Sequence, residues 1–182
     1  TFSFYGNKTI TTGEGGMIIF KNKKHYELGK LLRDHGMSTK KKYWHEIVGF
    51  NFRMTNLQAA VGVAQMERFE EIIQGKRKIF DFYNANLLNL QGIKKMPLDS
   101  VEFYNSSWLY TLILDSKINR NKLINDLNQL GIELRPSFCS LSEMPPYKDY
   151  KKSFNLKNSK LLSNSGVSLP SSSTLNKIQL KF

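Results

Sequence analysis

The sequence predicts an α/β protein in which the end of a large α/β domain, residues 1–92, precedes a small α+β domain, residues 93–182. A glycine-rich turn between short β-like runs opens the chain, and two amphipathic helices follow. After Gly92 and Pro97 the pattern changes to short strands and short helices. Hydrophobic residues make up 40% and aromatic residues 12% of the 182 positions, which provides a core and excludes collagen, coiled coil and disorder.

The first third of the chain contains a predicted hairpin, a helix and a long loop. Residues 9–20 predict a β-hairpin around a glycine-rich turn, because glycine adopts the positive φ angles of tight reversals. Residues 23–35 carry apolar side chains at helical spacing, and Gly36 stands where a helix cap belongs. Residues 37–54 are rich in aromatic and charged side chains, so we expect a loop that serves binding or an interface.

Two helices are predicted in the middle of the chain. The first covers residues 55–74, with Thr55 or Asn56 as its N-cap and small residues that permit close packing. The second covers residues 76–90 and ends before Gly92.

The last part of the chain predicts short elements separated by loops. In order they are a strand at 108–114, a helix at 120–130, a strand at 132–134, loops over 145–173 around a helix near 157–163, and a final helix from residue 175. The chain opens on Thr1 and closes within a helical pattern, so we expect a fragment of a longer protein.

Charge and composition restrict the function. Twenty-seven Lys and Arg against 15 Asp and Glu give a net charge of +12, which leaves a nucleic-acid-binding module as an alternative, although no basic-aromatic motif supports it. No apolar stretch is long enough for a membrane span and no signal peptide is recognisable, which predicts a cytoplasmic protein. Cys139 is the only cysteine, and His25, His35 and His45 show no metal-ligand pattern, so we expect no disulfide and no metal site.

Lys8 is the candidate for covalent chemistry. It lies ahead of the glycine turn among small hydrogen-bonding residues. Desolvation there would favour the neutral amine, which can attack a carbonyl carbon, and the Ser3 hydroxyl could donate to an anionic group nearby. Composition and spacing alone favour a lysine that merely leads a hairpin, because short motifs often match by chance.

Two long motifs carry a family resemblance. They are residues 3–16, Ser-Phe-Tyr-Gly-Asn-Lys-Thr-Ile-Thr-Thr-Gly-Glu-Gly-Gly, and residues 49–60, Gly-Phe-Asn-Phe-Arg-Met-Thr-Asn-Leu-Gln-Ala-Ala. With Arg135-Pro136 and residues 168–171, the chain resembles the DegT/DnrJ/EryC1/StrS family of nucleotide-sugar aminotransferases over essentially its whole length. Residues 43–49 most resemble the GDP-perosamine synthases of that family.

The resemblance implies an aspartate-aminotransferase-like fold (fold type I) that binds pyridoxal 5′-phosphate. Lys8 would carry the cofactor covalently, and Ser3 would hydrogen-bond its phosphate. Asn51 matches a family asparagine that reaches the cofactor phosphate of the other subunit, and Arg53 is a second candidate for this contact. The active unit would therefore be a homodimer.

The resemblance also implies the reaction, in which L-glutamate gives its amino group to a nucleotide-linked keto sugar for glycan synthesis. GDP-4-keto-6-deoxymannose is the expected acceptor, and a UDP- or dTDP-linked keto sugar is the alternative. His45 and Arg135 are candidates for substrate contacts, although a structural ion pair would equally explain Arg135. A noncatalytic or dehydrating relative is a further alternative, but dehydratases of the family carry histidine where Lys8 stands. Other cofactor ligands of the family precede the catalytic lysine, so we expect the chain alone to be inactive.

Overall fold

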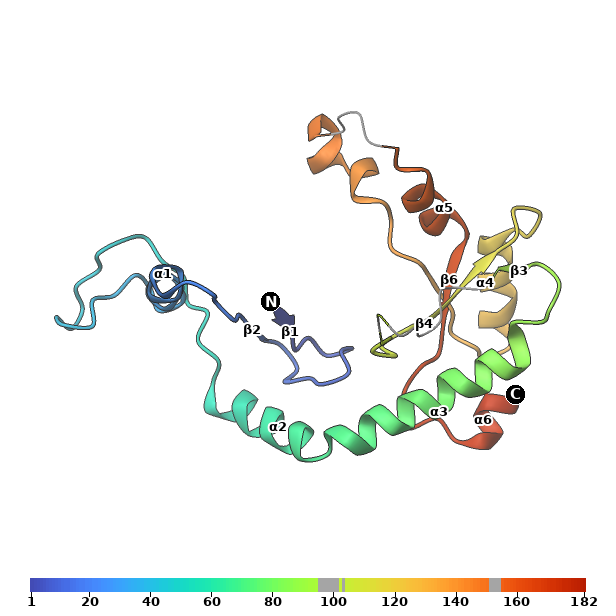
Figure 1. Ribbon diagram of the computed structural model, residues 1–182, viewed down its shortest axis with the longest axis horizontal. Coiled ribbons are helices and arrows are strands. Elements are labelled where there is room, and N and C mark those ends of the chain that lie inside the picture. The colour runs from blue at the N-terminus through green and yellow to red at the C-terminus, as the bar shows by residue number, and fades with distance from the viewer. Residues whose placement is uncertain (95–101, 103, 151–154) are drawn as a thin grey trace. The chain divides into compact units, whose positions relative to one another are not determined.

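A computed structural model describes residues 1–94, 102, 104–150 and 155–182, so Pro97 and part of the predicted 145–173 loop lie outside the described residues (Figure 1). The chain forms two compact units, residues 1–70 and residues 71–182.

The first unit opens with a two-stranded antiparallel ladder. Strand β1, Phe2–Ser3, pairs with β2, Gly16–Met17, so that Phe2 faces Met17 and Ser3 faces Gly16. The predicted hairpin over residues 9–20 is therefore wrong in its first strand. Residues 9–12 belong instead to the connection between β1 and β2, because the Thr11 hydroxyl and the Thr12 amide both hydrogen-bond to the Phe4 carbonyl.

Helix α1, Lys23–Arg33, confirms the helix predicted over residues 23–35. The Asn22 side chain caps its start by accepting hydrogen bonds from the amides of Lys24 and His25. At its end the chain turns with positive φ angles at His35 and Gly36, and the Gly36 amide donates to the Leu31 carbonyl at 2.8 Å. The glycine thus ends the helix as predicted.

Two consecutive helices follow, α2, Asn56–Glu67, and α3, Phe69–Leu87. Thr55 is the N-cap of α2 and forms a capping box with Gln58, which confirms the predicted start. The predicted break between residues 74 and 76 is wrong, because the first helix ends at Arg68 and Gly75 lies within α3. A Cβ at Gly75 would come within 3.2 Å of the Ser173 carbonyl oxygen, so this glycine permits a close approach.

The second unit contains a four-stranded antiparallel sheet in the order β3-β4-β6-β5. The strands are β3, Ile93–Lys94; β4, Tyr110–Leu114; β5, Arg135–Pro136; and β6, Gly166–Leu169. The predicted strand at 132–134 is wrong, because pairing begins at Arg135. Strand β6 was expected to be loop, yet it lies between β4 and β5 and buries Val167.

Short helices complete the second unit. They are α4, Arg120–Gln129; the 3-10 turns η1, Leu141–Glu143, and η2, Pro145–Tyr150; α5, Lys157–Ser165; and α6, Lys177–Lys181. Their positions confirm the helices predicted near 120–130, 157–163 and the end of the chain. No described helix is long and apolar enough to cross a membrane.

The core of the second unit combines α3 with the sheet. Its buried side chains are Ile79, Tyr83, Tyr110, Leu112, Leu114, Leu134 and Val167. Helix α3 supplies two of these residues, so most of it belongs to the compact unit that begins at Glu71, whereas the sequence placed a domain boundary after residue 92. The division of the complete family fold into a large and a small domain stays a prediction.

Hydrogen bonds connect α3 to neighbouring segments of this core. Burial, together with the charge of neighbouring Tyr83, raises the pKa of Tyr110 to about 12, and the Tyr110 hydroxyl donates to the Asn84 side chain at 2.9 Å. The Tyr83 hydroxyl donates to the Pro170 carbonyl at 2.8 Å. Both phenols therefore stay protonated while they connect α3 to its neighbours.

Lys76 is a buried amine on the same helix. Its Nζ donates to the carbonyls of Trp108 at 3.0 Å and Ser171 at 2.8 Å, and the residue is 8% exposed. Burial lowers the pKa of Lys76 from its ordinary value of 10.5. Even the neutral amine keeps two N–H groups, enough for both carbonyls.

We predict that Lys76→Met lowers the free energy of unfolding of the intact protein by about 1–3 kcal/mol, because two carbonyls lose their donor. The folded chain releases the Lys76 proton at a lower pH than the unfolded chain, so this site's stabilising contribution rises as pH increases toward 10.5. Urea unfolding at pH 7 and pH 9 should show a wider gap between wild type and variant at the higher pH. Lys78→Met, at an exposed position of α3, is the matched control. A gap that narrows with pH would contradict the prediction.

Candidate functional site

Lys8 lies on the connection between β1 and β2 and is partly buried. Its amide donates to the Tyr5 carbonyl at 2.9 Å, which makes residues 5–8 a tight turn. Phe4 joins the start of the connection to its end through two backbone hydrogen bonds. Its amide donates to the Gly15 carbonyl at 2.9 Å, and its carbonyl accepts from the Thr12 amide at 2.9 Å. The lysine is therefore presented from a loop whose two ends are joined by backbone hydrogen bonds.

Ser3 stands on β1, at the start of the same connection. Its hydroxyl accepts a hydrogen bond from the Tyr5 amide at 3.3 Å, and the residue is exposed. A serine hydroxyl that accepts one hydrogen bond keeps its own proton to donate. Ser3 can thus offer a donor to an anionic group beside the loop that carries Lys8.

Two glycines allow the loop to close. Gly15 has a φ of 139°, and a Cβ there would lie 2.8 Å from the Thr12 hydroxyl. A Cβ at Gly16 would lie 2.8 Å from the backbone carbonyl oxygen of Phe2 on the paired strand. A side chain at Gly16 would therefore push β1 away from β2 and displace Ser3.

Helix α2 supports the loop from the same unit. The Gln58 side-chain amide donates to the Glu14 carbonyl at 3.3 Å, and the Thr12 hydroxyl donates to the same carbonyl at 2.6 Å. The two motifs of residues 3–16 and 49–60 therefore meet in the folded unit.

These groups match the chemistry of pyridoxal phosphate. A primary amine on a closed loop can bond to the cofactor's aldehyde carbon, and a neighbouring hydroxyl can donate to its phosphate. The residues of this chain therefore fit the cofactor that the sequence predicts.

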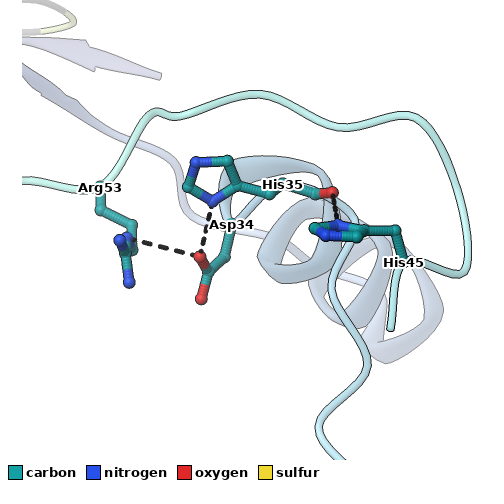
Figure 2. Close-up of polar contacts among 4 residues, drawn as sticks. All are labelled: Asp34, His35, His45 and Arg53. Atoms are coloured by element: carbon teal, nitrogen blue, oxygen red, sulfur yellow. Dashed lines mark hydrogen bonds and ion pairs between the residues drawn. The ribbon is translucent and has the colours of Figure 1, made fainter. Parts of the chain in front are cut away.

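Asn51 and Arg53 lie on the loop before α2, close to the end of α1. Asn51 is exposed and bridges Asp34 as an antiparallel partner. The Nε of Arg53 forms an ion pair with Oδ1 of Asp34 at 3.4 Å (Figure 2). The same carboxylate oxygen lies 3.1 Å from Nδ1 of His35.

His45 is exposed on this loop, and its Nδ1 lies 2.9 Å from the His35 carbonyl oxygen, as Figure 2 shows. The carbonyl can only accept, so Nδ1 of His45 carries the proton in this contact. Met37 and His45 also form an isolated antiparallel bridge. The imidazole therefore helps to hold the 37–54 loop against the end of α1.

Arg135 lies in the second unit, on β5, and forms an ion pair with Glu133. Its Nε and Nη2 lie 3.0 Å and 2.8 Å from Oε1 of Glu133, and both side chains are largely exposed. The sequence left a substrate contact and a structural ion pair open for Arg135, and the structure contains the ion pair.

Asp34 and Lys76 are polar residues that make structural contacts, and neither was predicted to do so from the sequence. Asp34 could have been found as the acidic member of the charged run Arg33-Asp34-His35 that ends α1. Lys76 lies three or four positions from Ile72, Ile73, Ile79 and Phe80, and this spacing places it on the apolar side of its helix. The structure contains no group of three metal-ligating side chains among the residues it describes.

Residues 1–181 match the DegT/DnrJ/EryC1/StrS aminotransferase family. The chain belongs to this family. A GDP-perosamine synthase from Caulobacter vibrioides is 43% identical over 149 residues, which are 81% of this chain and 40% of that protein. A GDP-perosamine synthase from Vibrio cholerae is 41% identical over 94% of this chain and 47% of its own length. The chain thus spans less than half the length of these relatives.

A wider comparison supports the family fold. The aminotransferase TlmJ from Streptoalloteichus hindustanus superposes with a TM-score of 0.88 at 21% identity, over 98% of this chain and 48% of that one. A UDP-4-amino-4,6-dideoxy-N-acetyl-beta-L-altrosamine transaminase from Campylobacter jejuni is 26% identical over the whole chain and 49% of its own length. The fold predicted from the sequence, that of the fold type I sugar aminotransferases, is confirmed.

We predict that Gly16→Ala in the full-length protein weakens pyridoxal phosphate binding about tenfold, because the new Cβ displaces β1 and with it Ser3. Gly13→Ala is the matched control, since a Cβ there has open space and only the φ of 79° opposes it. Absorbance titration of the apo protein with the cofactor measures both variants. Equal affinities for the two variants would contradict a steric role for Gly16.

Proposed function

We propose that the protein containing this chain is a pyridoxal-phosphate-dependent aminotransferase that transfers the amino group of L-glutamate to a keto nucleotide sugar. The observation that carries the proposal is the placement of Lys8 on the closed loop between β1 and β2, within the motif that the family resemblance rests on. Pyridoxal 5′-phosphate is the cofactor, and Lys8 is its covalent attachment point.

Lys8 holds the cofactor and then moves a proton. Bound pyridoxal phosphate supplies an aldehyde carbon for amino groups and a ring that stores the electrons of the broken C–H bond. As a free neutral amine, Nζ of Lys8 would be able to take a proton from the substrate carbon. Only a neutral amine has the lone pair for this, and arginine stays charged, so lysine is required.

Ser3 and Asn51 hold the cofactor phosphate. The Ser3 hydroxyl donates to it from β1 of the same chain, and the exposed Asn51 amide donates to it from the second chain of a homodimer. Arg53 adds a charged donor two residues later. Exposure of the 37–54 loop supports this arrangement, because Tyr43, Val48 and Phe52 are 77%, 89% and 70% exposed. We place the enzyme in the cytoplasm.

The substrate is proposed to be GDP-4-keto-6-deoxymannose, which transamination converts to GDP-perosamine for a surface glycan such as O-antigen. The identity of 43% to a GDP-perosamine synthase favours this substrate over a UDP- or dTDP-linked keto sugar. The 26% identity to a transaminase of a UDP-linked sugar keeps the UDP-linked class as the second candidate. His45, on the 37–54 loop, is the proposed substrate contact.

We predict that borohydride reduction of the full-length holoenzyme labels the peptide containing Lys8, because reduction fixes the bond between Nζ and the cofactor. Lys8→Ala should lose turnover by at least about 1000-fold, since attachment and proton transfer both disappear. With L-glutamate and a panel of GDP-, UDP- and dTDP-linked keto sugars, the wild type should aminate the GDP-linked 4-keto-6-deoxy sugar.

An unlabelled Lys8 peptide, or normal turnover in Lys8→Ala, would overturn the aminotransferase mechanism. Lys117→Ala, a change in the second unit at an exposed lysine, is the control for general effects of losing a surface amine. Amination of only a UDP- or dTDP-linked sugar would change the substrate and leave the mechanism in place.

The homodimer generates a separate prediction. Mixed dimers of Lys8→Ala and Asn51→Ala chains contain one site with wild-type Lys8 from one chain and wild-type Asn51 from the other. If Asn51 acts across the interface, mixing two impaired variants should restore activity in that site. Mixing under conditions that exchange subunits, followed by an activity assay, makes the measurement. No recovery in demonstrated heterodimers would place Asn51 in the site of its own chain.

A further inference from the structure

The end of α1 and the segment before α2 are joined by a short backbone ladder. The Phe50 amide donates to the Leu32 carbonyl at 2.7 Å, and the Phe52 amide donates to the Arg33 carbonyl at 2.9 Å. A third bond runs the other way, from the His35 amide to the Phe50 carbonyl at 2.8 Å. Residues 32–35 and 50–53 therefore hold a fixed backbone register.

This register brings two opposite charges together. Nε of Arg53 lies 3.4 Å from Oδ1 of Asp34, and Nδ1 of His35 lies 3.1 Å from the same oxygen (Figure 2). The Asp34 side chain is 31% exposed and the Arg53 side chain is 55% exposed. The carboxylate is thus the more sheltered member of the pair.

Arg53 contacts the Asp34 carboxylate through Nε. A guanidinium group presents its donors in a planar fork, and a carboxylate beside Nε restricts the positions that this fork can take. The terminal nitrogens Nη1 and Nη2 of a guanidinium group suit two parallel hydrogen bonds to a phosphate.

We propose that Asp34 is a positioning residue that orients Arg53 so that its terminal nitrogens bind the phosphate of pyridoxal phosphate. The inference rests on the proposed function, in which Arg53 is a phosphate ligand. Arg53 touches the phosphate, and Asp34 acts through Arg53 without contacting the cofactor.

Asp34 has two opposing effects on phosphate binding. Its negative charge reduces the attraction of the site for an anion, whereas its ion pair reduces the ordering that Arg53 must undergo on binding. Water screens the charge effect at this exposure, so orientation should be the larger effect. The two effects have opposite signs, and removal of the carboxylate therefore shows which one dominates.

The test compares Asp34→Asn with wild type as full-length apo protein, titrated with pyridoxal phosphate and with pyridoxal. We expect pyridoxal phosphate to bind about 3- to 10-fold more weakly to Asp34→Asn, because Arg53 loses its orientation. Pyridoxal lacks the phosphate, so its affinity should not change. Unchanged or tighter binding of pyridoxal phosphate would overturn the proposal, and so would an equal loss for both ligands.

A double-mutant cycle separates positioning from a general structural effect. Arg53→Gln should also weaken the binding of pyridoxal phosphate and not of pyridoxal, and Asp34→Asn should add no further loss on that background. Additive losses would mean that Asp34 acts independently of Arg53 and would overturn the proposal. Arg53→Gln leaves Asp34 intact. If this variant binds pyridoxal phosphate and pyridoxal as tightly as wild type does, Arg53 is not a phosphate ligand and the proposal fails.

Two controls complete the experiment. His35→Asn removes the second contact of Asp34 at a position whose φ of 59° asparagine tolerates. The loss seen in Asp34→Asn should be absent there, and the same loss would overturn the assignment to Arg53. Asp126→Asn breaks an exposed ion pair with Lys122 in the second unit and should bind both ligands as wild type does. If Lys8 is labelled by borohydride while Asp34→Asn binds normally, only the positioning inference fails.

Discussion

The site depends on the closure of the loop between β1 and β2. Phe4 joins both sides of this loop through its amide and its carbonyl, and the glycines at 15 and 16 allow the backbone to approach without a steric clash. The closed loop fixes where Lys8 and Ser3 stand relative to each other, which a flexible hairpin tip would not do. Helix α2 reinforces the closure through Gln58. The position of the Lys8 amine therefore depends on this backbone arrangement.

The loop before α2 is fixed mainly by polar contacts with neighbouring segments. It has many exposed aromatic side chains and little apolar burial, so contacts with neighbouring segments must fix it. Backbone bonds to the end of α1, the Asp34–Arg53 ion pair and the His45 contact with the His35 carbonyl provide them. Polar bonds thereby hold Asn51 and Arg53 in place on a surface that carries the proposed interface.

The second unit shows how buried polar groups can organise a small core. Lys76, Tyr83 and Tyr110 are each buried, and each hydrogen-bonds to a carbonyl or amide of a segment distant in sequence. Paired in this way, they avoid the cost of an unsatisfied buried group. They also select one arrangement of α3 against the sheet, which apolar packing alone specifies less strictly.

Features that depend on neighbouring residues could be predicted before the fold was known. Thr55 and Gly36 fixed helix limits, and the motifs around Lys8 and Asn51 identified the family. Which segments pair is known only from the folded chain. Strand β6, Gly-Val-Ser-Leu, is only four residues long, so its central place follows from β4 and β5, which lie far away in the chain. The contact of Lys76 with the Ser171 carbonyl, 95 residues away, could likewise not be predicted from the sequence. Nor could the ion pair between Asp34 and Arg53. Local periodicity carries no information about contacts between distant segments.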